Sequence, residues 1–84
     1  MKLRIVVNKK KQAILVYGLY ELLQEDPIDG GWLVQYLSRL TPYAVYICKR
    51  EHAPPNAVEV EFTDAYSTYR EIKRIAREWK DEEG

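Results

Sequence analysis

The sequence predicts an α+β fold in which a four-stranded, mainly antiparallel sheet carries helices on one face, as two layers around one core. Short apolar or alternating stretches at residues 2–7, 13–17, 43–50 and 58–62 are typical of strands. Longer stretches with helical apolar spacing follow the second and the fourth of them. The expected order is therefore strand, strand, helix, strand, strand, helix (ββαββα).

The first strands are predicted from two kinds of pattern. Alternate apolar positions in residues 2–7 indicate a strand with one buried side. The apolar run at residues 13–17 favours a second strand, although its leucine also shares a helical face with the leucines that follow. We expect this strand to end near Tyr17, with Gly18 as a break before a helical turn that ends near Gln24.

A longer helix is predicted after Asp26, because an aspartate followed by Pro27 suits a helix N-terminus. Gly30 and Gly31 weaken a helix that spans them. We therefore expect a firm helix only from Trp32 onward, with the glycines forming a turn that brings Trp32 into the core. The predicted apolar stripe of this helix comprises Leu33, Tyr36, Leu37 and Leu40.

The second half of the chain predicts another hairpin and a final helix. Residues 43–50 and 58–62 form its strands, joined by a loop that two prolines stiffen. Asp64 or the threonine before it caps the last helix, which runs to about Lys80.

A winged-helix fold is the alternative architecture. Residues 12–40 would then form two helices, residues 43–62 the wing, and the C-terminal helix a dimerisation element. The chain offers no clear recognition helix between Leu40 and Tyr43, which disfavours this alternative.

Size and composition predict one domain. With 84 residues, 46% of them apolar and 31% charged, the chain suits a single compact domain at residues 1–80 and a disordered acidic tail at residues 81–84. Thirteen basic and thirteen acidic residues cancel, which argues against nonspecific coating of DNA by the whole molecule. The bases nevertheless gather in residues 1–11 and 70–80, which indicates local patches.

The cellular setting is predicted from the same composition. Cys48 is the only cysteine, which excludes an internal disulfide and favours a small buried side chain in a reducing, cytoplasmic setting. No apolar stretch approaches a membrane span, so we expect no membrane partner. The content of lysine, arginine and glutamate is typical of a thermophilic, archaeal or viral source.

No arrangement of residues predicts catalysis. A zinc site needs three or four ligands, and the chain offers only His52 and Cys48 close together in sequence. Glu59 and Glu61 lack the third carboxylate that would suggest a metal-dependent nuclease. There is no glycine-rich phosphate loop and no nucleophile motif. We expect no enzyme activity, cofactor, metal or small-molecule ligand.

Charge sorting in the last helix gives the leading functional hypothesis. At about 100° per residue, Tyr69, Ile72, Ile75, Ala76 and Trp79 gather on one side, and the bases gather nearly opposite. Three consecutive lysines at the tip of the first hairpin form a second basic group. The hypothesis is a non-enzymatic protein that binds nucleic acid through its phosphates. The candidate contact residues are Lys9, Lys10, Lys11, Arg50, Arg70, Lys73, Arg74 and Arg77.

Two other interpretations compete with nucleic-acid binding. The first is that each basic group is only part of an ordinary solvated surface. Nucleic-acid binding therefore requires that the fold bring the basic groups onto one face. The other is a protein-interaction or self-assembly module, because the net charge is zero and aromatic residues are abundant. The aromatic candidates for such a homodimer or partner contact are Tyr20, Tyr43, Tyr46, Tyr66 and Trp79.

Overall fold

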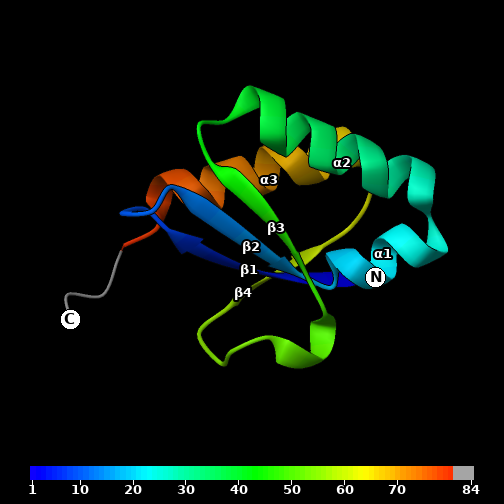
Figure 1. The fold of residues 1–84 in the computed structure, drawn as a ribbon, viewed down its shortest axis with the longest axis horizontal. Helices are drawn as coiled ribbons and strands as arrows, with labels where there is room; N and C mark the ends of the chain where they lie inside the picture. The colour runs from blue at the N-terminus through cyan, green and yellow to red at the C-terminus, as the bar shows by residue number, and fades with distance from the viewer. Residues whose placement is uncertain (81–84) are drawn as a thin grey trace.

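The computed structural model describes residues 1–80, which form a sheet with two long helices packed across one face (Figure 1). The predicted acidic tail at residues 81–84 lies outside the described residues. The predicted α+β class and element order are confirmed. The elements are β1 (Lys2–Asn8), β2 (Ala13–Tyr17), α1 (Leu19–Glu25), α2 (Pro27–Leu40), β3 (Ala44–Cys48), the 3-10 turn η1 (Arg50–His52), β4 (Val58–Glu61) and α3 (Ala65–Glu78).

The strands lie in the order β3-β2-β1-β4. β1 is antiparallel to both β2 and β4, so the sheet is mainly antiparallel as predicted, while β2 and β3 are parallel. The predicted second hairpin is wrong, because β3 and β4 occupy opposite edges of the sheet. The two helices between β2 and β3 form a crossover, which returns the chain parallel to β2. β4 then pairs with the remaining edge, where Val60 lies opposite Leu3.

Residues 13–17 form β2, a central strand of the sheet, which excludes the winged-helix alternative because that fold requires a helix there. Ile14 and Val16 are completely buried, and β2 hydrogen-bonds to β1 on one side and β3 on the other. The other face of β2 carries Leu15 and Tyr17, which are half-buried, so both faces hold apolar side chains and the apolar run is continuous instead of alternating. That is why the residues from Ala13 onward resembled a helix as much as a strand.

α2 differs from its prediction in two respects. It is helical from Pro27, through both glycines, and the Asp26 carboxylate accepts a hydrogen bond from the Asp29 amide at 3.3 Å. Helix α1 packs so closely that a Cβ at Gly30 would lie 2.9 Å from a methyl carbon of Leu23. Continuous helix also turns Trp32 outward, so it is 55% exposed and not in the core.

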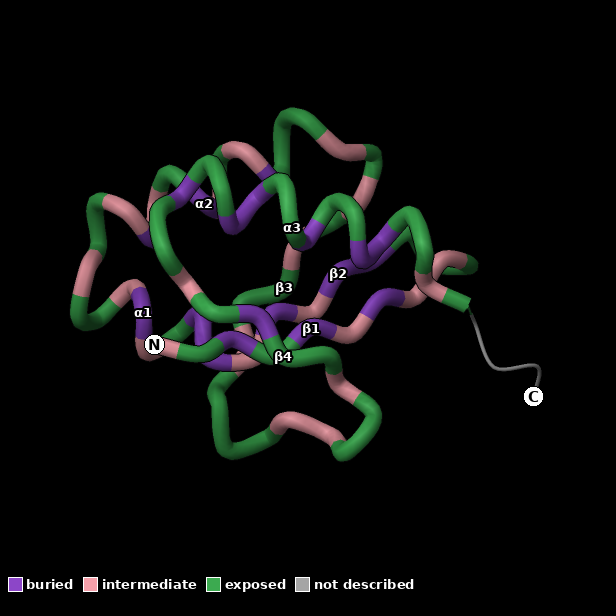
Figure 2. Tube along the Cα trace, turned by 180° about the vertical axis from the view of Figure 1, so that it is seen from behind, coloured by how far each residue is buried: buried purple, intermediate pink, exposed green. Residues whose placement is uncertain are grey.

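The core is one apolar layer between the sheet and the helices α2 and α3 (Figure 2). Leu33 and Leu37 of α2 are completely buried in it. Asp64 caps α3, as expected, by accepting a hydrogen bond from the Ser67 amide at 2.8 Å. The predicted inner side of α3 is confirmed, with its buried members being Tyr69, Ile72, Ile75 and Ala76 and with Trp79 half-buried beside them.

The two glycines of α2 should respond oppositely to alanine. A Cβ at Gly31 would meet nothing within 4 Å, so Gly31→Ala should stabilise the fold by about 0.5–1 kcal/mol through helix propensity. Gly30→Ala gains the same propensity but crowds Leu23 and should give little or no stabilisation. Urea unfolding of both variants tests the close contact between α1 and α2, and equal stabilisation would contradict it.

Candidate nucleic-acid interface

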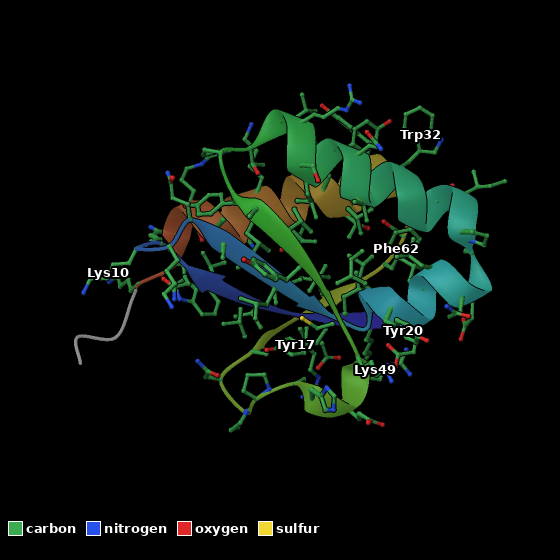
Figure 3. All side chains as sticks on the ribbon, in the orientation of Figure 1. Lys10, Tyr17, Tyr20, Trp32, Lys49 and Phe62 are labelled. Atoms are coloured by element: carbon green, nitrogen blue, oxygen red, sulfur yellow. The ribbon has the colours of Figure 1, made fainter. Side chains whose placement is uncertain are left out.

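The lysine-rich turn between β1 and β2 lies against the C-terminal end of α3. The Lys9 amino group donates a hydrogen bond to the Arg77 carbonyl oxygen at 3.2 Å. A cation at this end of a helix is favoured by the helix dipole. Figure 3 places Lys10 at the tip of this hairpin, close to the last turn of α3 in the same view. The fold therefore joins two basic segments that are distant in sequence.

The turn itself is held in a defined shape. The Asn8 side-chain oxygen accepts a hydrogen bond from the Lys11 amide at 3.0 Å, and the Gln12 amide donates to the Lys9 carbonyl at 3.2 Å. Gln12 adopts a left-handed backbone conformation, with φ of 50°, to close the turn. Lys10 and Lys11 are consequently presented outward, and both side chains are exposed.

Arg50 lies at the other end of the sheet. The lysine turn precedes β2 and Arg50 follows β3, and the two strands run parallel. A five-residue strand separates these ends by about 16 Å. The Arg50 amide donates to the Glu21 carboxylate at 3.1 and 3.3 Å, and Lys49 lies over the Tyr20 ring at 5.2 Å. The structure thus does not bring Arg50 together with the other candidate residues.

Arg74 is engaged by two carboxylates on its own helix. Its guanidinium hydrogen-bonds to Glu71, one turn before it, and to Glu78 at 2.8 Å, one turn after it. The hydrogen bond from Arg74 lowers the pKa of Glu71 below its ordinary value. The charge of Arg74 is therefore compensated locally. Glu71 lies three residues before Arg74 and Glu78 lies four residues after it, so both carboxylates stand on the same side of the helix as Arg74.

The other bases of α3 differ in whether a neighbouring side chain already contacts them. Lys73 lies 5.7 Å from the centre of the Tyr69 ring and donates to its hydroxyl at 3.3 Å. Arg70 and Arg77 are exposed and make no ion pair within residues 1–80. Together with Lys10 and Lys11, these two arginines are the cations available to a ligand.

We call the outer face of α3 and the lysine turn the basic surface. It carries eight bases and two acids, Glu71 and Glu78. Residues 1–80 hold thirteen bases and ten acids, so outside the basic surface the described residues have five bases and eight acids, and the bases are concentrated on this surface. The eight bases are Lys9, Lys10, Lys11, Arg70, Lys73, Arg74, Arg77 and Lys80.

An aromatic cluster borders this surface, between α2 and α3. Trp32 stacks on Tyr36 at 5.8 Å between ring centres, and Tyr36 contacts Tyr66 at 5.5 Å and Tyr69 at 5.8 Å. Trp32 and Tyr66 are half-exposed. The outward position of Trp32 differs from its predicted place in the core, and the signal for it was Ile28, an apolar residue four positions earlier that is also exposed.

Other reactive groups do not form a site in the described chain. His52 is exposed, and its imidazole lies 3.5 Å from the Glu51 carboxylate. Burial raises the pKa of Cys48, which disfavours the reactive thiolate. Within residues 1–80 no three histidine, cysteine or acidic residues are grouped to hold a metal ion. No helix in the same range has the length and apolar character needed to cross a membrane.

Known proteins do not identify this surface. Comparison with known protein families, with curated proteins and with solved structures gives no match. A functional proposal therefore rests on the charges and contacts of the described residues.

The pairing of Arg74 with Glu71 can be tested by titration. Arg74→Ala should raise the pKa of Glu71 back toward its ordinary value, measured by carboxyl NMR, because the hydrogen bond that lowers it is lost. In the unchanged protein this pair contributes stability above the unfolded pKa of Glu71 and loses it as pH falls through the folded value. Arg70→Ala is the matched control, and an equal rise in the pKa of Glu71 in that variant would contradict the specific pairing with Arg74.

Proposed function

We propose that this protein is a non-enzymatic nucleic-acid-binding protein that contacts the phosphate backbone with its basic surface. The observation that carries the proposal is the hydrogen bond from Lys9 to the Arg77 carbonyl, since it joins the lysine turn and α3 into one cationic face. Neutralising several phosphates releases their condensed counterions, which is the main source of affinity for such a surface. An intracellular location, expected from the single cysteine, fits this role.

The spacing of the available cations suits a polyanionic strand. Arg70 and Arg77 are seven residues apart, or about 10.5 Å along the helix axis, which equals about three nucleotides at 3.4 Å each. A strand that follows α3 from Arg70 toward Arg77 continues to Lys10 and Lys11, because the lysine turn lies at that end of the helix. The arginines offer forked donors to phosphate, and the lysines offer adaptable point charges.

The remaining bases have supporting roles in this proposal. Lys9 fixes the turn to the helix, and Lys73 lies on Tyr69 at the border of the surface. Arg74 is compensated by Glu71 and Glu78 and contributes less than its neighbours. Contacts of this kind position a nucleic acid without reading its bases. Arg50 is not part of the proposed interface.

Salt dependence gives a direct test. Fluorescence anisotropy with a labelled DNA duplex should give a slope of log affinity against log salt of about −4 for about four phosphate contacts. Arg70→Gln combined with Arg77→Gln should reduce the slope by about 2.

The matched control removes the same charge from the other end of the sheet. Lys49→Gln combined with Arg50→Gln should leave affinity and slope unchanged, because neither residue belongs to the basic surface. Absence of binding at low salt, or equal losses in the two double variants, would contradict the proposal.

A second test adds available charge without adding a base. Glu71→Gln combined with Glu78→Gln removes the carboxylates that engage Arg74, so the slope should steepen by about 1 to 3 as repulsion falls and Arg74 becomes available. Glu59→Gln combined with Glu61→Gln removes two acids from β4 and serves as the control. Equal steepening in both variants would indicate a general charge effect and contradict a local interface.

A further inference from the structure

An aromatic ring lies in line with the cations of α3. At about 100° per residue, four side chains of this helix fall within an arc of about 60° around its axis. We call them the outer row, which consists of Tyr66, Arg70, Lys73 and Arg77. The two acids of the basic surface lie outside this arc, on the far side of Arg74. The outer row therefore combines one ring with three bases and contains no carboxylate.

The ring of Tyr66 is held in place and is still accessible. Its centre lies 5.5 Å from the ring of Tyr36 on α2, in edge contact, and 5.5 Å from the ring of Tyr69. Tyr69 is buried in the core and supports Tyr66 from within. Tyr66 is nevertheless 51% exposed. A ring that its neighbours already position loses little freedom when a ligand stacks on it, which lowers the cost of binding.

A hollow on the surface of α3 connects this ring to the cations. It is lined by both tyrosines of the helix, by all four of its bases, by Ser67 and by Glu71. Glu71 is the one carboxylate that borders the hollow, and it is engaged by Arg74. The lining therefore has an excess of positive charge next to an aromatic surface. A ligand that complements it carries negative charge and a flat, polarisable group close together.

The spacing along the helix fits one strand of nucleic acid. Tyr66 and Arg70 are four residues apart, or about 6 Å along the axis, so a base on the ring has its own phosphate within reach of the guanidinium. From there the phosphates follow the path already described, past Arg77 to the lysine turn, which is fixed at that end of the helix by Lys9. The ring thus lies at the start of the cationic path.

We infer that the basic surface prefers single-stranded nucleic acid, with one base stacked on Tyr66 and the adjoining phosphates on Arg70, Arg77 and the lysine turn. This inference rests on the proposed function, to which it adds the class of nucleic acid. In a duplex the base faces are stacked on one another, so only the backbone reaches α3. A single strand has free base faces, and aromatic side chains beside a positively charged groove bind such faces with little dependence on sequence.

Removal of the ring separates stacking from phosphate contact. Tyr66→Leu should weaken binding of a labelled oligothymidylate strand at least about fivefold in fluorescence anisotropy, and it should leave binding of the same strand annealed to its complement unchanged. Tyr66→Phe keeps the ring and should bind the strand as the unchanged protein does. Tyr46→Leu is the matched control, because Tyr46 is similarly exposed, at 53%, but lies on β3. Unchanged strand binding by Tyr66→Leu, or an equal loss in Tyr46→Leu, would overturn the inference.

A strand without bases tests the same inference on the unchanged protein. An abasic strand of equal length carries the same phosphates, so it should bind at least about fivefold more weakly than oligothymidylate. Equal binding of the two strands would overturn the stacking and leave the proposed function standing, because phosphate contacts then account for the affinity. Absence of binding to the duplex and to both strands would overturn both. Competition by polyglutamate as effective as by oligothymidylate would assign the hollow to an acidic protein and overturn the inference.

Discussion

One apolar layer holds the fold together, and the orientation of both long helices depends on it. Leu3 and Ile5 of β1, Leu33 of α2 and Ile72 of α3 are completely buried there. Each fully buried aliphatic side chain of this size is worth about 1.5–3 kcal/mol. Neither helix can rotate without bringing polar groups into this layer. The inward residues therefore determine which side of each helix faces water, so the basic surface and the outward position of Trp32 are both consequences of the same packing.

Sequence patterns were sufficient where local structure and burial coincide. In α3, the cap at Asp64 and the helical spacing of Ile72 and Ile75 predicted both the helix and its buried side, because one period satisfies both requirements. The partner of β3 was not predictable in this way. The residue pattern of a strand does not determine which edge of the sheet it joins. Only the crossover through α1 and α2 makes β3 parallel to β2. The hairpin assumed for β3 and β4 failed for that reason.

Features of the candidate surfaces that depend on tertiary contacts could not be predicted from the sequence. The sorting of charge on α3 was visible in the sequence, but the contact of Lys9 with Arg77 depends on how a hairpin docks onto a helix. Helix propensity predicted a break at Gly30, whereas the close approach of Leu23 leaves little room for a side chain at this position of the helix. Once a break is assumed there, Trp32 has no fixed position around the helix axis, and its exposed place on α2 is not predictable.

The contact between Lys9 and Arg77 spans 68 positions of the chain. The β1–β2 hairpin and α3 are far apart in an unfolded chain, so the cationic surface exists as a continuous unit only after the sheet and its helices have assembled. An anion that bridges both segments binds the folded state far better than the unfolded one, and it stabilises the fold by mass action in proportion to its concentration. In the proposed function, the last helix links binding of the anion to completion of folding, because a chain with α3 undocked has the same charges but no common surface on which to present them.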